Sequence, residues 1–166
     1  MSKSKSVEIV EPRHTIAEHV EKDGPGAVTA ADLKRFDRNI AANLGFEYMA
    51  WVQADMANLE LALQRIEAGG ETAGQATNDF RAIVHETRGL GGTFGYNLIS
   101  AIGDQLYRML DNVETPGPGQ TTAIRLHLDA MKTVLAEGLK GDGGDRGQDV
   151  MVGLRDVFKK YSRRRS

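Results

Sequence analysis

Apolar residues recur at intervals of three and four along most of the chain, and this spacing limits the fold more than any other feature of the sequence. The longest run contains six residues: Met49, Val52, Met56, Leu59, Leu63 and Ile66. An α-helix turns by about 100° per residue, so residues at this spacing lie on one face of a helix. No segment shows the sustained period of two that is typical of a strand. The sequence therefore predicts an all-α protein.

Glycine and proline residues divide this pattern into six predicted helices. Gly45 separates the first two helices, and the segments 69–70, 91–92, 116–119 and 141–144 end the next four. The helices are predicted to begin and end near residues 29–44, 46–69, 72–91, 97–113, 121–139 and 150–161.

Short polar side chains are predicted to cap three of these helices. Thr29 and Asn97 precede apolar runs, where such residues often accept a hydrogen bond from the first turn of a helix. Thr72 is followed by Gln75, which is the spacing of a capping box.

The loop lengths predict an antiparallel four-helix bundle with additional N-terminal and C-terminal helices. Short loops between long helices favour antiparallel neighbours, and the four helices from Phe46 to Gly141 are joined in this way. We therefore expect a flexible N-terminal arm over 1–28, a capping helix over 29–44, the bundle over 45–141, and an amphipathic helix with a basic tail over 142–166. The apolar faces of the two terminal helices could alternatively form a dimerisation surface.

Composition excludes several kinds of site and partner. The chain has 21 Lys and Arg residues against 23 Asp and Glu residues, which gives no bulk electrostatic attraction for nucleic acid. It has no cysteine, so disulfides, thiolate nucleophiles and cysteine-ligated zinc are excluded. No segment approaches the ~18 consecutive apolar residues of a membrane span. We expect a free-standing, cytoplasmic, monomeric protein that binds neither nucleic acid nor membrane.

His85 is the residue that most suggests a function. A helical wheel places it about 160° from the centre of the apolar face of its helix, so the imidazole should face water. Residues at i−4, i+3, i+4 and i+7 share that outer face, and these are Arg81, Arg88, Gly89 and Gly92. Glycine inside a helix costs about 0.5–1 kcal/mol relative to alanine, so glycines here suggest that open space is needed.

These residue types suit a carrier of phosphoryl groups. Imidazole is largely neutral near pH 7 and has a nucleophilic nitrogen. Arg88 and Arg81 could donate charge-assisted hydrogen bonds to phosphoryl oxygens. Gly89 and Gly92 would leave room for the active site of a partner protein to approach the ring.

The segment around His85 resembles the histidine-containing phosphotransfer (HPt) family. The matching motif is His85, a basic residue at Arg88, Gly89, and Gly95 ten residues after the histidine. The resemblance implies that His85 is the phospho-acceptor, that Arg88 stabilises the phosphate, that Gly89 gives clearance, and that Gly95 makes the turn into the next helix. It also implies a four-helix bundle, and it extends over about Phe46 to Gly141.

The same resemblance implies the kind of partner and cofactor. A family member shuttles phosphoryl groups between response-regulator receiver domains in a two-component phosphorelay, and a hybrid sensor kinase is a further candidate partner. It has no catalytic or ATP-binding site of its own and holds no cofactor, because the receiver domain supplies the aspartate and the Mg²⁺. The sequence shows no nucleotide-binding motif.

The sequence also allows a different function, and it contains three further histidines. The alternative function is a non-phosphorylated helical adaptor or dimerisation module, in which His85 is an ordinary surface residue. His127 lies beside an apolar stripe and is expected to be a half-buried packing residue and not a ligand. His14 and His19 are expected in the N-terminal arm, and no metal site is predicted from them.

Overall fold

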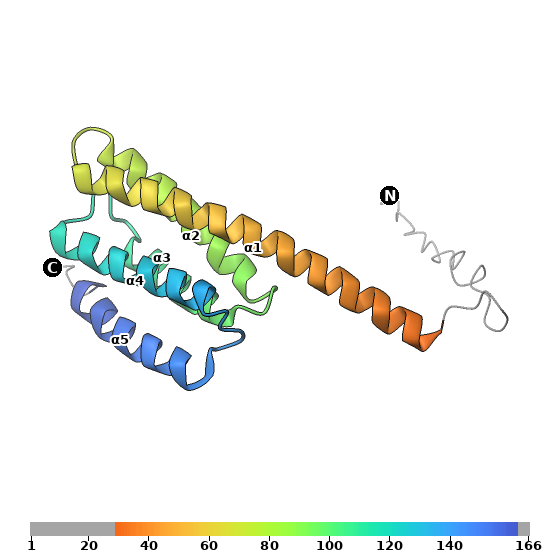
Figure 1. The fold of residues 1–166 in the computed structure, drawn as a ribbon. Coiled ribbons are helices and arrows are strands. Elements are labelled where there is room, and N and C mark those ends of the chain that lie inside the picture. The colour runs from red at the N-terminus through yellow and green to blue at the C-terminus, as the bar shows by residue number, and fades with distance from the viewer. Residues whose placement is uncertain (1–28, 163–166) are drawn as a thin grey trace, which may run out of the picture. The chain divides into compact units, whose positions relative to one another are not determined.

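The computed structural model describes residues 29–162, and every regular element in that range is an α-helix (Figure 1). Five helices follow one another along the chain: α1 (Ala30–Ala68), α2 (Ala73–Gly91), α3 (Asn97–Met109), α4 (Pro118–Ala136) and α5 (Gly144–Ser162). The prediction of an all-α protein is therefore confirmed for this range. The predicted arm over 1–28 and the basic tail from Arg163 to Arg165 lie outside the described residues.

The predicted interruption at Gly45 is wrong, because α1 is one continuous helix of 39 residues. The N-cap predicted at Thr29, directly before α1, is confirmed. The hydroxyl of Thr29 accepts a hydrogen bond from the Asp32 N–H at 3.1 Å, and the Asp32 carboxylate accepts one from the Thr29 N–H at 3.1 Å. Gly45 is tolerated inside the helix, where a glycine costs about 0.5–1 kcal/mol and does not by itself end the helix.

The chain divides into two compact units, Met1–Asn43 and Leu44–Ser166, with the boundary inside α1. In the first unit, the described side chains of residues 31–40, 42 and 43 are all exposed. They include Leu33, Phe36 and Ile40, which are 55%, 64% and 41% exposed. These three residues recur at intervals of three and four and so share one face of the helix within the first unit.

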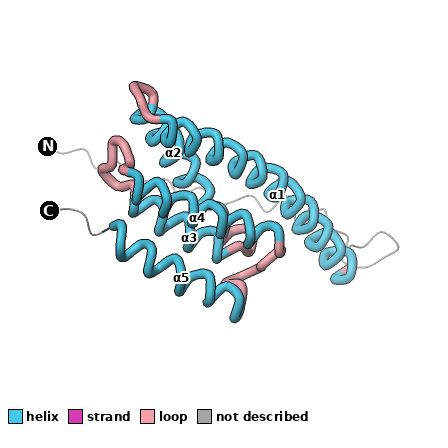
Figure 2. The backbone as a smooth tube through the Cα atoms, turned by 60° about the vertical axis from the view of Figure 1, so that its left-hand side comes forward, coloured by secondary structure: helices cyan, strands magenta, loops and turns pink. Residues whose placement is uncertain are grey.

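The second unit contains one core to which all five helices contribute. Short loops join its helices, as the backbone trace shows (Figure 2). Full burial of a large aliphatic or aromatic side chain contributes about 1.5–3 kcal/mol, so this core is the main source of stability. Its fully buried large residues include Val52, Leu59 and Leu63 of α1, Phe80 of α2, Ile99, Ile102 and Leu106 of α3, and Ile124, Leu128 and Met131 of α4, while Leu154 of α5 is 6% exposed.

Two of the predicted N-caps are wrong. Thr72 precedes α2 but makes no side-chain capping hydrogen bond, and Gln75 instead donates to Asp79 one turn further along the helix. Asn97 is the first residue of α3, so Tyr96 occupies the N-cap position. Helix α4 begins inside the segment expected to be a loop, because Pro118 suits the first helical position and lacks an N–H that would need a partner.

Polar contacts join α1 to its neighbours in the second unit. Arg125 of α4 donates hydrogen bonds to Glu67 at 2.7 Å and to Glu60 at 3.1 Å, and Lys132 of α4 also pairs with Glu60. The hydrogen bond from Lys132 is the main reason that the pKa of Glu60 is lowered. These pairs are partly exposed, so their contribution is small beside that of the core.

An aromatic cluster packs α1 against the turn between α2 and α3. The ring of Tyr48 stacks on Phe94 at 4.5 Å and on Tyr96 at 5.5 Å between centroids. Burial raises the pKa of Tyr48 to about 12. The turn that follows the His85 helix is therefore held by apolar packing as well as by its backbone.

Among the helices of residues 29–162, none combines the length and the apolar character that a membrane crossing requires.

Candidate functional site

His85 lies in the middle of α2 on its solvent side. Its side chain is exposed, while the neighbouring Val84 and Thr87 are buried in the second unit. This is the orientation that the helical wheel predicts. The reason is local, since the core-facing residues of α2 recur at three and four and leave His85 on the opposite face.

Three side chains contact Arg88 and hold it in place: His85, Asp104 and Tyr107. Its Nη2 atom lies 3.3 Å from Nδ1 of His85, and its Nη1 atom donates to Oδ1 of Asp104 at 3.0 Å. Its guanidinium carbon lies 4.2 Å from the centroid of the Tyr107 ring, which is cation–π geometry. The side chain is only 28% exposed. The guanidinium is therefore fixed in position rather than free in solvent.

The hydrogen bond from Arg88 indicates which nitrogen of the neutral His85 ring carries the proton. A guanidinium only donates hydrogen bonds, so Nδ1 must accept with its lone pair. In the neutral ring the proton then resides on Nε2. A group attached at Nε2 would take the place of that proton and leave the contact with Arg88 intact.

A shallow depression of about 380 Å³ opens beside the ring, lined by His85, Arg88, Gly89, Ser100 and Asp104. The ring of Tyr107 closes one side of the site, with its centroid 5.4 Å from that of His85. The site is thus built from one face of α2 and one face of α3.

The three glycines predicted beside His85 have different surroundings. A Cβ atom on Gly89 would meet nothing within 4 Å, so this position is open toward solvent. A Cβ on Gly92 would reach Asn97 and Ser100 only at 3.8 Å, which is ordinary contact. Gly95 has φ +78°, a conformation that favours glycine.

Gly95 closes α2 in a Schellman motif. Its N–H donates to Gly92 at 3.2 Å, and the Tyr96 N–H donates to Gly91 at 2.7 Å. The turn is also bonded to the loop before α5. The Gly141 N–H donates to the Gly95 carbonyl at 2.7 Å, and the Leu98 N–H donates to the Gly141 carbonyl at 2.9 Å. Four backbone hydrogen bonds therefore hold the end of the His85 helix.

Arg81 is not brought to His85, although the sequence predicts it on the same face. Its guanidinium donates to the carbonyl of Leu110 at 2.9 Å and to that of Val113 at 2.7 Å. Leu110 is the C-cap residue of α3, where carbonyl groups lack partners within the helix, and Val113 lies in the loop that follows. Arg81 therefore fastens the segment after α3 to α2 and is not placed to contact a group on His85.

Four residues of the site were not predicted from the sequence: Ser100, Gly103, Asp104 and Tyr107 of α3. A Cβ on Gly103 would lie 2.8 Å from Cβ of Arg88, so only glycine lets the two helices approach so closely here. The signal was present as a small residue and an acidic residue next to each other, followed three residues later by a tyrosine outside the apolar stripe. That α3 lies beside this face of α2 could not be read from the sequence.

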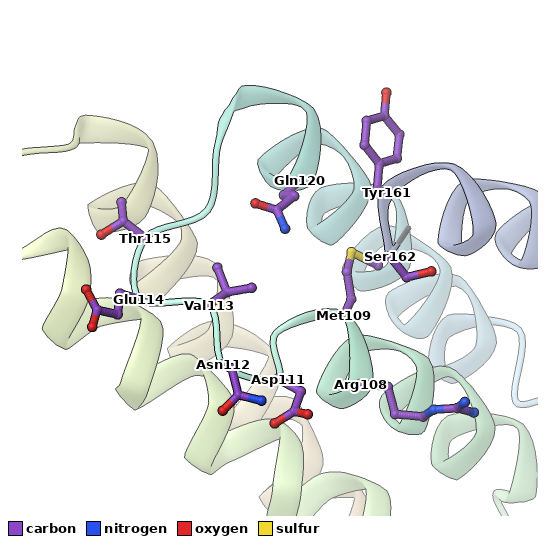
Figure 3. A pocket seen from close by; sticks show the side chains of 10 residues that line it. All are labelled: Arg108, Met109, Asp111, Asn112, Val113, Glu114, Thr115, Gln120, Tyr161 and Ser162. Atoms are coloured by element: carbon purple, nitrogen blue, oxygen red, sulfur yellow. The ribbon is translucent and has the colours of Figure 1, made fainter. Parts of the chain in front are cut away.

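A larger cavity in the second unit lies elsewhere. Its volume is about 630 Å³, and its walls come from the end of α3, the loop after α3, Gln120 of α4 and the end of α5 (Figure 3). The charged side chains around it are Arg108, Asp111 and Glu114, and no histidine lines it. It shares no residue with the depression beside His85.

His127 is completely buried, which is more than the half-buried packing position expected. Its Nδ1 lies 2.8 Å from the Ala123 carbonyl, and its Nε2 lies 3.1 Å from the Gln105 side chain. Burial is the main reason that its pKa is lowered, so the ring is neutral at pH 7. Within residues 29–162 no group of three or more acidic or histidine side chains is arranged to hold a metal ion.

Comparisons of the chain with protein-family models, with curated proteins and with solved structures give no significant match.

Proposed function

We propose that this protein is a histidine phosphotransfer protein and that His85 carries the phosphoryl group. The observation that carries the proposal is an exposed imidazole beside an open depression, with its Nδ1 3.3 Å from a fixed guanidinium. In this proposal, residues 44–68 of α1 together with α2, α3 and α4 form an antiparallel four-helix bundle, and α5 is an addition to it.

In this proposal, the transfer step needs only the His85 imidazole from this chain. The hydrogen bond from Arg88 to Nδ1 favours the tautomer that has its proton on Nε2, so the ring must first change to the tautomer that has its proton on Nδ1. In that reactive tautomer, Nε2 has the lone pair and attacks the phosphorus of a phosphoaspartate on the partner. The N–P bond forms while the bond from phosphorus to the aspartyl oxygen breaks, and the aspartate leaves as a carboxylate. The proton on Nδ1 passes to solvent. Nδ1 then accepts the hydrogen bond from Arg88, as it does in the structure.

The partners in this proposal are response-regulator receiver domains, with a hybrid sensor kinase as a further candidate. A receiver brings its own Mg²⁺, which neutralises the phosphoryl oxygens during transfer. The open position of Gly89 gives the receiver access to the ring. The setting proposed is the cytoplasm, and the protein acts as a monomer.

The test is phosphoryl transfer from a phosphorylated receiver domain. The protein should acquire a label that is lost in acid and kept in base, as expected for a phosphoramidate. His85→Gln should abolish the label, whereas Glu86→Gln, at the adjacent exposed position, should keep it. A label that survives in His85→Gln, or an unlabelled wild-type protein across the receivers of the same genome, would contradict the proposal.

A second candidate function is a helical dimerisation module that pairs with a second copy of the chain. It is favoured by the exposed apolar face of Leu33, Phe36 and Ile40 in the first unit, whose spacing of three and four is that of a helix-pairing seam. Light scattering should then give twice the monomer mass, and Phe36→Lys should restore the monomer. A wild-type monomer across the micromolar range would exclude this function.

A further inference from the structure

We propose that Arg88, positioned by Asp104, prolongs the lifetime of phosphorylated His85 by occupying Nδ1. This inference rests on the proposed function, because it concerns the phosphohistidine that the function requires. It assigns Asp104 as a positioning residue, which acts on the ring only through Arg88. It also gives Arg88 a role at the ring nitrogen, in addition to any contact with phosphoryl oxygens.

The reason lies in how a phosphohistidine is lost. Water attacks the phosphorus, the bond between phosphorus and Nε2 breaks, and the electron pair of that bond returns to the ring. The products are inorganic phosphate and histidine. The ring leaves far more readily when Nδ1 is protonated, because it then departs as a neutral imidazole. A guanidinium that already donates to the Nδ1 lone pair opposes that protonation through both its hydrogen bond and its charge.

The structure keeps Arg88 in the position that this role requires. The side chain is paired with Asp104 at 3.0 Å and lies 4.2 Å from the centroid of the Tyr107 ring. Gly103 lets α3 approach the base of the same side chain. A free arginine would lose rotamer entropy each time it reached Nδ1, and these contacts reduce that loss.

The charged and titratable groups around the ring come from two helices. Arg88 faces it from α2, and Asp104 and Tyr107 belong to the facing surface of α3. Arg108 reaches the second oxygen of Asp104 at 3.7 Å. The negative charge of Asp104 acting directly on the ring would favour protonation of Nδ1. Its action through Arg88 opposes protonation, so the two effects have opposite signs.

The experiment measures the loss of the phosphoryl group from the purified full-length protein at pH values from 5 to 8. Phosphoramidate serves as the donor, so no receiver domain is needed, and His85→Gln gives the background from other histidines. The variants are Asp104→Asn, Arg88→Met and Asp104→Glu. The matched control is Asp156→Asn, which changes an exposed aspartate on α5. Thermal unfolding of each variant checks that the fold is kept.

Asp104→Asn should move the pH profile of phosphoryl loss toward higher pH by about half to one pH unit, which is about a three- to tenfold shorter half-life on the sloping part of the profile. Arg88→Met should move it in the same direction and at least as far. Asp104→Glu should return the profile toward that of the wild type, and Asp156→Asn should leave it unchanged.

An unchanged profile in Asp104→Asn and Arg88→Met overturns the inference. A shift toward lower pH in Asp104→Asn also overturns it, because that is the sign of a direct charge effect. Failure of phosphoramidate to label His85 overturns it as well. The proposed function fails separately, when phosphoramidate labels His85 and the lifetimes shift as expected but no phosphorylated receiver transfers its group.

Discussion

At the scale of single residues, a buried carboxyl group lies on the inner side of the His85 helix. Asp55 of α1 is 8% exposed, and its Oδ2 lies 3.1 Å from the hydroxyl oxygen of Thr87. The same hydroxyl lies 2.9 Å from the Ile83 carbonyl. A hydroxyl has one proton, so when Thr87 donates to Ile83, a protonated Asp55 can donate to Thr87. Burial is the main reason that the pKa of Asp55 is raised.

The pKa of Asp55 leads to a prediction about stability and pH. Because the pKa is higher in the folded state than in the unfolded chain, the stability associated with this group is complete below the unfolded value, about 3.9, and is lost as pH rises through the folded value. Asp55→Asn removes the ionisation and keeps a donor for Thr87. The variant should therefore be more stable than the wild type at pH 7, with a difference that shrinks as pH falls toward 4.

Urea unfolding at pH 4, 5.5 and 7 measures this difference. Thr77→Val is a useful comparison, since Thr77 is also buried in α2 but bonds only to the Ala73 carbonyl of its own helix, and its effect should not depend on pH. A wild type that is more stable than Asp55→Asn at every pH would contradict the prediction.

Residue patterns in the sequence predicted the exposure of His85 and the nearby position of Arg88, because both follow from helical geometry within α2. They failed for Arg81, because its partners are carbonyls at the end of α3 and in the loop after it. They also missed Asp104, whose role depends on how α2 and α3 face each other. A helical wheel gives direction within one helix and carries no information about which helix lies opposite.

At the scale of helices, the contact between α2 and α3 depends on glycines with unequal roles. A Cβ on Gly91 would lie 2.7 Å from the Ser100 hydroxyl oxygen and 2.9 Å from the Tyr96 carbonyl. A Cβ on Gly89, two residues earlier in the same helix, would meet nothing. One glycine therefore permits close packing, while the other only leaves open space beside His85.

This difference predicts opposite effects for two alanine substitutions. Gly91→Ala should lower the free energy of unfolding by about 1–3 kcal/mol, because the backbone carbonyl of Tyr96 cannot move away cheaply. Gly89→Ala should raise it by about 0.5–1 kcal/mol, because alanine favours the helix and has room. Chemical denaturation measures both changes. Equal effects of the two substitutions would show that the packing around Gly91 has room for a Cβ atom, which contradicts the prediction.

Gly89→Ala also separates stability from function. If the proposed docking of a receiver over His85 is right, the more stable variant should accept phosphoryl groups more slowly. Faster transfer in this variant would show that the open position has no role in access.

Periodicity predicted that helices cover most of 29–162, because burial imposes that pattern on any helix at a core. It was wrong for Leu90 of α2, which it placed on the core face and which is 40% exposed. It was less successful at helix ends. Gln75 had a second partner in Asp79, and Gly45 was read as an end although a single glycine is a weak helix breaker. A local sequence pattern shows that a capping partner or a helix end is available at a position. Whether the chain uses it depends on the other contacts that form in the folded structure.

At the scale of the whole molecule, the two ends of the described chain differ in what they bury. None of the described side chains over 31–40, 42 and 43 is buried. Helix α5 buries Leu154, and five of its residues pack partly buried against the core: Val150, Met151, Val157, Phe158 and Tyr161. The core of the second unit therefore includes α5.

Two truncations test this difference by thermal unfolding. A chain that begins at Leu44 should unfold within about 2 °C of the full-length protein, because no buried side chain of the described part is removed. A chain that ends at Lys140 should unfold at a temperature lower by at least about 10 °C, because apolar surface of α3 and α4 becomes exposed. The opposite ranking would show that α5 is not part of the core.

The backbone hydrogen bonds of Gly141 to Gly95 and Leu98 connect the turn after the His85 helix with the turn before α5. Neither turn can open without breaking bonds of the other, so the two should open as one cooperative unit in amide hydrogen exchange. The amides of Leu98 and Gly141 should then exchange at a common rate. A binding event that loosens the end of α2 at Gly91 would also release the start of α5 at Gly144.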